Sequence, residues 1–323
     1  MNADAPLDPQ LRSLVARQLE DAARAEPRLA RIVPGALIRH VKRKRIILRA
    51  ALDGRAVILR MHLDPADGAA RRDWDEMERL WPYMSQGDLR IPEPICAAPE
   101  AGVTVQEDVP GTPLMSLLYS LDEAERGAHL PRAAAWLRAS TAPTEAFEAA
   151  QPDRWIARAE RAARQQPFDG LQKIEAGILA QMRRLAPAIE AAPWRCAICH
   201  GDFHPNNLIV EAPRVTGIDL GGSRRMPVLK DIARFAMHMG RRRLRLSPVS
   251  VFGVDRDCLA EFAQGFALDA HERGVVLPFF LGFEALIRVE NLGLPPGRIA
   301  RAAKTYAALL ADLERAEAEA PLI

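Results

Sequence analysis

The alternation of apolar and polar positions divides the chain into a short strand-rich part and a longer helical part. Apolar residues first recur at helical spacing, at Leu11, Leu14, Val15, Leu19 and Ala22. Residues 36–63 then alternate or run apolar, as strands do. Asp53-Gly54 interrupts this run with a residue pair typical of tight hairpin turns. The pattern predicts an opening helix followed by an antiparallel hairpin.

A second amphipathic helix and a further strand complete the strand-rich part. Within residues 67–84, one helical face carries Trp74, Met77, Leu80 and Trp81, and Pro82 marks the expected end of the helix. The proline-punctuated stretch that follows contains a short strand at Val103–Gln106 and then the turn "PGTP". This turn predicts the boundary between a small β-rich lobe of about five strands and a larger lobe.

From residue 122 onward the chain is rich in Ala, Arg, Leu and Glu and has the spacing of helices. The exception lies between about residues 195 and 230, where strand-like runs return. Near the end of the chain, a closing amphipathic helix is indicated by one apolar stripe formed by Ile299, Tyr306, Leu309, Leu310 and Leu313. We therefore expect a helical lobe with one β insert.

Composition and charge narrow the class of protein. The 323 residues are 49% hydrophobic and 27% charged, a balance typical of soluble globular proteins. The net charge of +2 does not favour binding to nucleic acid. The longest apolar run, residues 274–283, is shorter than the roughly 20 residues of a membrane-spanning helix, and the N-terminus lacks the order of a signal peptide. We expect a cytoplasmic protein without membrane insertion.

The four cysteines, Cys96, Cys196, Cys199 and Cys258, are too few and too scattered for a disulfide framework. Cys196 and Cys199 form a C-x-x-C pair, but a zinc site would need a second pair. The stretch "RCAICHGD" instead predicts a buried strand that runs into a polar turn. Buried structural cysteines are the favoured interpretation.

That polar turn, "HGDFHPNN" at residues 200–207, contains the candidate chemistry. Asp202 and Asn207 lie five residues apart in it, and Asp219 ends the next strand in "IDLGG". Oxygen donors from the two arms of a hairpin, Asn207 and Asp219, suit Mg²⁺, which completes its shell with phosphate oxygens and water. Asp202 could then accept the proton of an incoming hydroxyl. Asp202 alone could equally be a turn residue, but the ordered combination favours phosphoryl transfer.

The segments "HGDFHPNN", "IDLGG" and "DIARF" together resemble the catalytic core of the aminoglycoside phosphotransferase and choline kinase family, relatives of the protein kinases. The resemblance covers roughly residues 33–240. It implies that Asp202 is the catalytic residue, that Asn207 and Asp219 bind metal, and that Asp231 has a structural role. We expect His200 to hold the loop by hydrogen bonds.

The resemblance also implies a bilobal, protein-kinase-like α+β fold, with a small antiparallel β lobe and a larger, mostly helical lobe. The expected limits are residues 1–106 for the nucleotide lobe with its leading helix, 107–111 for the hinge and 112–323 for the helical lobe. The helical lobe would carry the catalytic loop and the substrate site, and ATP would bind between the lobes.

The nucleotide-binding residues follow from the same resemblance. "RAVILRM" resembles the strand that carries the phosphate-contacting basic residue, which is Arg60 here. The helix "RRDWDEMERL" would supply its acidic partner, Asp73 by spacing, with Glu76 as the competitor. Backbone atoms around Glu107–Val109 would meet the adenine ring.

The chain departs from the family pattern in two turns. The first hairpin has "VKRKR" in place of a glycine-rich turn, so Lys42, Arg43 and Lys44 either cover the phosphates or belong to a solvated strand. After Asp219, Leu220 and Gly221 replace the aromatic and acidic residues that are frequent there. These differences indicate a divergent subfamily with a substrate of its own.

The predicted function is an ATP- and Mg²⁺-dependent transfer of the γ-phosphoryl group to a hydroxyl of a small aminoglycoside-, choline- or sugar-like molecule. The arginine cluster at residues 241–245 either ends a helix favourably or points to an anionic sugar acceptor. A non-catalytic nucleotide-binding module with a kinase-like fold is a further alternative.

Overall fold

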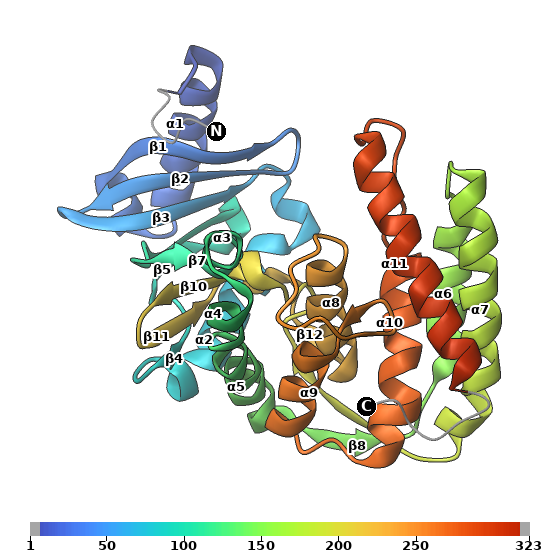
Figure 1. Ribbon diagram of the computed structural model, residues 1–323. Helices are drawn as coiled ribbons and strands as arrows, with labels where there is room; N and C mark the ends of the chain where they lie inside the picture. Colours follow the sequence, from blue (N-terminus) through green and yellow to red (C-terminus); the bar gives the residue numbers. More distant parts are fainter. Residues whose placement is uncertain (1–6, 317–323) are drawn as a thin grey trace. The chain divides into compact units, whose positions relative to one another are not determined.

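The computed structural model describes residues 7–316, which form two compact units (Figure 1). The first unit combines the chain up to Thr112 with Ile209–Ser223, and the second combines Pro113–Leu208 with the chain from Arg224 onward. The limits predicted for the lobes and the hinge remain predictions.

An antiparallel five-stranded sheet is the centre of the first unit. The Asp53-Gly54 hairpin is confirmed, because Leu52 pairs with Arg55 and the two turn residues have φ values of 52° and 82°. Both values lie in the left-handed region that such two-residue turns require. In spatial order, the strands are β1 (Ile32–Val41), β2 (Arg45–Leu52), β3 (Arg55–His62), β6 (Val103–Glu107) and β5 (Pro94–Ala98).

One face of this sheet packs against the opening helix, α1 (Pro9–Ala23), as the apolar spacing predicts. Strand β2 buries every second side chain in this core, whereas β6 is buried on both faces over Val103–Gln106. The core contains Leu11, Val15 and Leu19 of α1 and Ile46, Leu48, Val57, Leu59, Val103 and Val105 of the strands. Short 3₁₀ turns at Pro27–Arg31, Pro65–Asp67 and Pro99–Ala101 connect these elements.

The second helix, α2 (Ala69–Met84), continues past the position at which we expected it to end. Pro82 lies in its last turn, where few backbone hydrogen bonds remain to be lost. The prediction that Pro82 ends the helix was therefore wrong by two residues. The buried face also differs from the expected one, since it includes Asp73 and Glu76 whereas Trp74 and Trp81 are half-buried.

A smaller sheet carries the hairpin that follows the polar turn. Its order is β4-β11-β10-β7, and β11 runs parallel to β4. The chain leaves β11 into the 3₁₀ turn Leu220–Gly222, so that Asp219 lies directly before this turn. The strands are β4 (Leu89–Arg90), β7 (Thr112–Pro113), β10 (Leu208–Glu211) and β11 (Arg214–Gly217).

The second unit is mainly helical, with the predicted β insert. Helix α7 packs against α6 and α11, and α8 packs against α10 (Figure 1). The helices are α3 (Leu114–Ser120), α4 (Glu123–Gly127), α5 (Leu130–Thr141), α6 (Pro152–Ala163), α7 (Asp169–Glu190), α8 (Leu229–Gly240), α9 (Arg256–Gly265), α10 (Leu277–Leu286) and α11 (Pro296–Arg315). Further turns cover Ala142–Thr144, Pro205–Asn207 and the π-helical Glu272–Val276.

The longest apolar run of the sequence forms helix α10, which is buried on all sides. Phe280 and Phe283 pack edge to face with Trp155, whose ring centroid lies 4.8 Å from that of Phe283. None of the helices in residues 7–316 combines the length and the hydropathy that a membrane crossing requires.

The β insert consists of a buried strand with one partner on each side. Strand β9 (Trp194–Cys199) lies between β12 (Arg224–Pro227) and β8 (Ala146–Glu148), and a separate hairpin pairs β13 (Ser250–Val251) with β14 (Val254–Asp255). All four cysteines are free and buried, as expected. Burial raises the pKa of Cys196 to about 12, so the pair with Cys199 does not present a thiolate.

One buried acid in helix α7 makes stability depend on pH. Glu175 is fully buried and accepts a hydrogen bond from Nε2 of Gln166 at 2.7 Å. Burial raises the pKa of Glu175 from 4.5 to about 7, although the Gln166 bond acts in the opposite direction. Because the folded pKa is raised, the stabilisation is complete below pH 4.5 and is lost as the pH rises through about 7.

We expect Glu175→Gln, which resembles the protonated acid, to remove this pH dependence. The unsubstituted protein should lose about 2 kcal/mol of unfolding free energy through Glu175 when the pH rises from 5 to 8, and the variant should not. Urea denaturation at the two pH values measures the difference. Glu190→Gln, at an exposed position of the same helix, is the control. Equal pH dependence in all three proteins would contradict the assignment.

Candidate active site

The polar turn after β9 places Asp202 directly after Gly201, whose backbone has a conformation that glycine adopts most easily. Gly201 has a φ of 82°, in the left-handed region. His200 is buried beside Trp136, and its Nδ1 accepts a hydrogen bond from the Asp202 N–H at 3.4 Å. This contact is the loop-holding role predicted for His200. The Asp202 side chain remains 47% exposed, so a small molecule can reach it.

Helix α8 holds this loop through both backbone groups of Gly201. Lys230 donates from Nζ to the Gly201 carbonyl at 2.6 Å, and the Gly201 N–H donates to Oδ2 of Asp231 at 2.9 Å. Both side chains are buried, and they contact each other at 3.4 Å. Asp231 therefore has a structural position, and Lys230 shares it.

Two arginines contact the Asp202 carboxylate, Arg234 of helix α8 and Arg288 just after helix α10. Its Oδ1 lies 2.9 Å from Nε of Arg234 and 3.4 Å from Nη2 of Arg288. Its Oδ2 lies 3.4 Å from Nε2 of His204. Burial alone would raise the pKa of Asp202, but the His204 hydrogen bond and the two guanidinium groups outweigh it and hold the pKa far below its usual range. Asp202 is thus ionised and only weakly basic.

These cations are balanced by one buried acid of helix α10. Glu284 is fully buried, with Oε1 at 3.3 Å from Lys230 Nζ and Oε2 at 3.4 Å from Arg288 Nε. The same Oε2 lies 3.9 Å from Nε of Arg234. Glu284 therefore connects the lysine that holds Gly201 with the two arginines that contact Asp202.

Asn207 is attached to the same loop. Its Nδ2 donates to the backbone carbonyl of Asp202 at 3.0 Å, and the side chain is buried. This bond uses the amide nitrogen and leaves Oδ1 as the side-chain atom that can coordinate a cation.

The first unit contains a second ionic cluster, built on strand β3. Arg60 is 6% exposed, with Nε at 3.1 Å from Oδ2 of Asp73 and Nη2 at 2.6 Å from Oδ1 of Asp219. Burial alone would lower the pKa of Arg60, but the carboxylates of Asp73 and Asp219 outweigh it and raise the pKa. Asp73 is the partner of Arg60, while Glu76 pairs with Arg79 at 2.7 Å.

The backbone at Asp219 explains the unusual turn that follows it. Asp219 has a φ of 64°, which asparagine and aspartate tolerate better than most residues. A Cβ at Gly221 would lie 3.2 Å from Oδ1 and 3.3 Å from Cβ of Asp73. Glycine at 221 therefore lets the turn approach helix α2 closely, and this approach places Asp219 and Asp73 on the same arginine.

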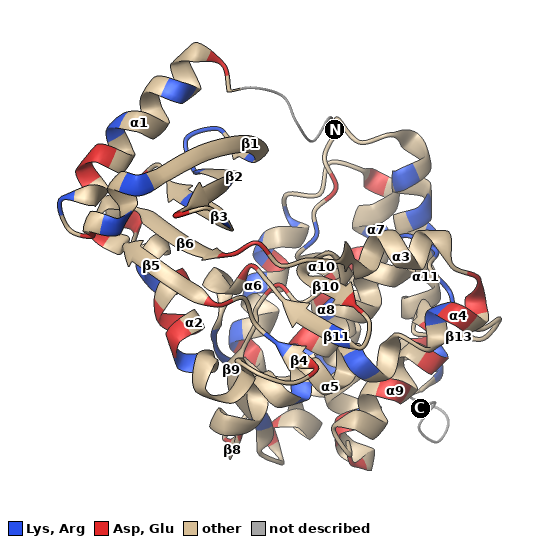
Figure 2. Cartoon of the chain, turned by 90° about the vertical axis from the view of Figure 1, so that its left-hand side faces the viewer, with Lys and Arg blue, Asp and Glu red and all other residues tan. Residues whose placement is uncertain are grey.

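Of the four basic residues at positions 42–45, in the turn from β1 into β2, only Arg45 contacts this ionic cluster. Lys42, Arg43 and Lys44 are exposed, and the turn is blue in Figure 2. Arg45, the first residue of β2, instead reaches Asp219, with Nη1 at 3.3 Å from Oδ1. The first unit thus directs two guanidinium groups at the carboxylate of Asp219.

The predicted adenine-contacting segment follows the end of strand β6. Glu107 is the last residue of the strand, and its side chain accepts a hydrogen bond from the Glu93 N–H at 3.1 Å. Residues 108–110, which include Val109, lie outside regular secondary structure. Their backbone groups are therefore not part of the sheet ladder.

The donor set fits the predicted magnesium. Among residues 7–316, no three His, Cys, Asp or Glu side chains gather into a metal site of their own. Asn207 in the second unit and Asp219 in the first each carry a side-chain oxygen, the kind of ligand atom that Mg²⁺ prefers.

The structure shows contacts that sequence reasoning did not predict for Arg45, Lys230, Arg234, Glu284 and Arg288. Lys230 and Arg234 lie one helical turn apart, Lys230 directly before "DIARF" and Arg234 within it. Their spacing of four residues places them on one helix face and was an available signal. Glu284 lies in a purely apolar run, where an acid requires partners when it is buried.

Comparison with known proteins identifies a family and a fold. A model of the phosphotransferase enzyme family matches residues 44–272, most of the chain. Among curated proteins, none matches the chain by sequence.

Three solved structures are similar over nearly their whole length. Aminoglycoside phosphotransferase APH(4)-Ia is 17% identical, with a TM-score of 0.59 over 93% of this chain and 98% of that one. Amicoumacin kinase hAmiN, in complex with AMP-PNP, Ca²⁺ and Ami, is 12% identical, with a TM-score of 0.59 over 92% and 95%. A choline/ethanolamine kinase family protein from Mesorhizobium loti is 17% identical, with a TM-score of 0.55 over 94% and 99%. These similarities confirm the predicted protein-kinase-like α+β fold.

Lys230 provides a test of how the loop is held. Replacement of Lys230 by Met leaves Asp231 and Glu284 buried without their shared cation, so we expect a loss of about 3–5 kcal/mol of unfolding free energy. Thermal and urea denaturation measure this loss. Lys173→Met, at an exposed position, is the control and should have little effect. A loss below about 1 kcal/mol would show that Lys230 does not stabilise the buried carboxylates of Asp231 and Glu284.

Proposed function

Because the chain belongs to the phosphotransferase enzyme family and is a small-molecule kinase, we propose that it transfers the γ-phosphoryl group of ATP to a hydroxyl of a small molecule. The observation that carries this proposal is the exposed, ionised Asp202, held by a loop clamped at Gly201 and joined to Asn207. A carboxylate that is kept charged and accessible, at the end of a rigid strand, can orient an alcohol.

In the proposed reaction, the acceptor hydroxyl donates its hydrogen to Asp202. A bond forms between the acceptor oxygen and the γ-phosphorus, the bond from that phosphorus to the β–γ bridging oxygen breaks, and ADP leaves. The proton passes to Asp202 and then to solvent. A weak base suffices because phosphoryl transfer proceeds through a loose transition state in which positioning contributes most. The two arginines beside Asp202 maintain its charge and direction.

The first unit would supply the nucleotide contacts. Arg60 presents a planar fork that suits phosphate oxygens, and Asp73 fixes this fork from the other side. Backbone groups around Glu107 and Val109 would bind the adenine. Asn207 and Asp219 would hold Mg²⁺, which when bound neutralises charge on the phosphates. The complex of amicoumacin kinase with AMP-PNP, an ATP analogue, supports the choice of nucleotide.

Replacement of Asp202 by Ala tests the role of the carboxylate. We expect turnover to fall by roughly a hundredfold or more, while nucleotide affinity changes by less than about threefold, because Asp202 contacts the acceptor and not the phosphates. ADP release is measured over a panel of aminoglycosides, choline, amino sugars and sugar acids. Asp257→Ala, which removes an exposed aspartate, is the control. Unchanged turnover would refute the role of Asp202, and absence of ADP release with every acceptor would favour a non-catalytic module.

Replacement of Arg60 by Lys tests the nucleotide contact. The lysine keeps the charge but loses the fork, so we expect about tenfold weaker binding of Mg²⁺-AMP-PNP by calorimetry. Arg55→Lys, at an exposed position of the same strand, should bind as the unsubstituted protein does. Equal affinity of both variants would remove Arg60 from the phosphate site.

A further inference from the structure

A second group of cations lies in the helical unit, at the end of α8 and the start of α11. Arg241, Arg242, Arg298 and Arg301 line a hollow of about 160 Å³, together with Tyr119 of helix α3. We call this site the arginine hollow. This volume is too small for a whole drug-sized ligand but can hold one chemical group of a small molecule.

The arginine hollow has more positive charge than the described carboxylates neutralise. Arg241 forms an ion pair with Glu290, and Arg242 donates from Nη1 to the His238 carbonyl at 3.1 Å. Within residues 7–316, no carboxylate lies within 4.0 Å of the guanidinium groups of Arg298 or Arg301. Burial lowers the pKa of Arg242 to about 10, and the neighbouring arginines add to this effect. Crowded, partly desolvated cations are unfavourable until an anion offsets them.

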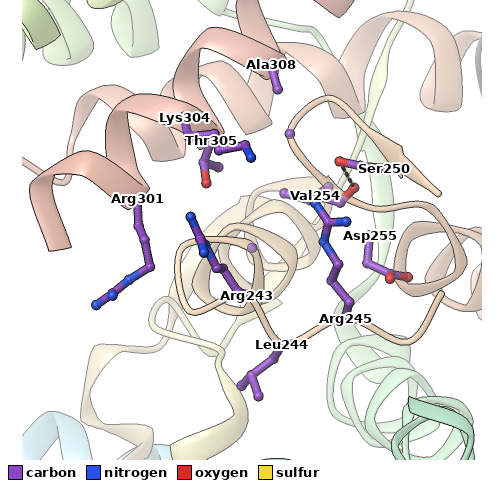
Figure 3. A pocket seen from close by; sticks show the side chains of 12 residues that line it. Arg243, Leu244, Arg245, Ser250, Val254, Asp255, Arg301, Lys304, Thr305 and Ala308 are labelled. Carbon is purple, nitrogen blue, oxygen red and sulfur yellow. Dashed lines mark hydrogen bonds between the residues drawn. The ribbon is translucent and has the colours of Figure 1, made fainter. Parts of the chain in front are cut away.

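The positive surface continues beyond Arg301 into a wider hollow of about 350 Å³, to which Arg243, Arg245 and Lys304 contribute (Figure 3). Figure 3 shows Arg243 reaching toward Thr305 of helix α11, and Arg245 reaching toward Val254 and Ser250. The acid in this wall, Asp255, is already used, because its Oδ2 accepts from the Leu246 N–H at 2.9 Å and the Ser247 N–H at 3.0 Å.

The same field of charge extends to Asp202. The pKa of Arg241 is lowered first by burial and then by the charges of Arg298, Arg288 and Arg234, among others. Two of these, Arg234 and Arg288, contact the Asp202 carboxylate. Arg234 and Arg241 lie seven residues apart, roughly 10 Å along helix α8, so the arginine hollow begins near the arginine that contacts Asp202. A cationic acceptor at Asp202 would be repelled by these arginines.

We propose that the arginine hollow binds an acidic group, a phosphate or a carboxylate, of the phosphoryl acceptor. This inference rests on the proposed function and adds the charge of the substrate to it. Guanidinium forks pair with both kinds of oxyanion, and the exposed ring of Tyr119, at 58% exposure, borders the entrance.

The first experiment measures anion binding without turnover. The protein is saturated with Mg²⁺-AMP-PNP, and its melting temperature is followed as inorganic phosphate is added at low ionic strength. We expect a concentration-dependent rise that is lost in the double variant Arg298→Gln, Arg301→Gln. The double variant Arg17→Gln, Arg161→Gln loses the same charge from exposed helix positions and should keep the rise. No rise, or an equal rise in all three proteins, would overturn the proposal.

The second experiment compares acceptors on one scaffold: glucose, glucosamine, glucose 6-phosphate and glucuronate. We expect ADP release with the phosphate ester or the acid, and an at least tenfold higher KM for that acceptor in the Arg298, Arg301 variant, with kcat changed less than twofold. The two anionic sugars distinguish a phosphate from a carboxylate. Turnover of glucose or glucosamine alone, or an unchanged KM, would overturn the proposal.

The two experiments separate the failure of this inference from that of the proposed function. Phosphate binding that depends on Arg298 and Arg301, without ADP release from any acceptor, would retain the anion site and count against phosphoryl transfer. ADP release that Asp202→Ala abolishes, with acceptors that carry no acid, would retain the function and refute the anionic substrate.

Discussion

The helical unit depends on the charge balance around Glu284. Helix α10 is buried on all sides, so this carboxylate cannot reach water and must be met by cations. Lys230, Arg234 and Arg288 form ion pairs with it, and each of them also contacts the polar turn, at Gly201 or at Asp202. The position of the loop is therefore coupled to the packing of the core, and a change in one cannot leave the other unaffected.

Both units present a carboxylate by the same physical means. A residue in the left-handed region ends or follows a strand, at Gly201 beside Asp202 and at Asp219 itself. Arginine forks then hold the carboxylate, from Arg234 and Arg288 in one unit and from Arg45 and Arg60 in the other. Because a guanidinium binds carboxylate and phosphate oxygens with similar geometry, the groups that order the free protein also suit a phosphorylated ligand.

The divergence from the family pattern has a structural reason in the turn after Asp219. A Cβ at Gly221 would lie 3.2 Å from Oδ1 of Asp73, so a larger residue would press against the acid that pairs with Arg60. The basic β1–β2 turn, in contrast, contributes Arg45 alone to this cluster, while its three preceding cations remain exposed. The arginines of the helical unit change the electrostatic character of the site and not its backbone. Substrate preference can therefore diverge while the phosphotransfer fold is retained.

The sequence alone was sufficient for the elements with strong local signals: the Asp53-Gly54 hairpin, the helix α1, the buried strand β9 and the polar turn with Asp202 and Asn207. These depend on periodicity and turn chemistry, which neighbouring residues determine. The choice of Asp73 over Glu76 as the partner of Arg60, the continuation of α2 through Pro82, and the roles of Glu284 and Arg288 depended on tertiary structure. Charge pairing between residues 13 to 159 positions apart is decided by packing, because a side chain acquires its partners and its burial only when distant segments meet.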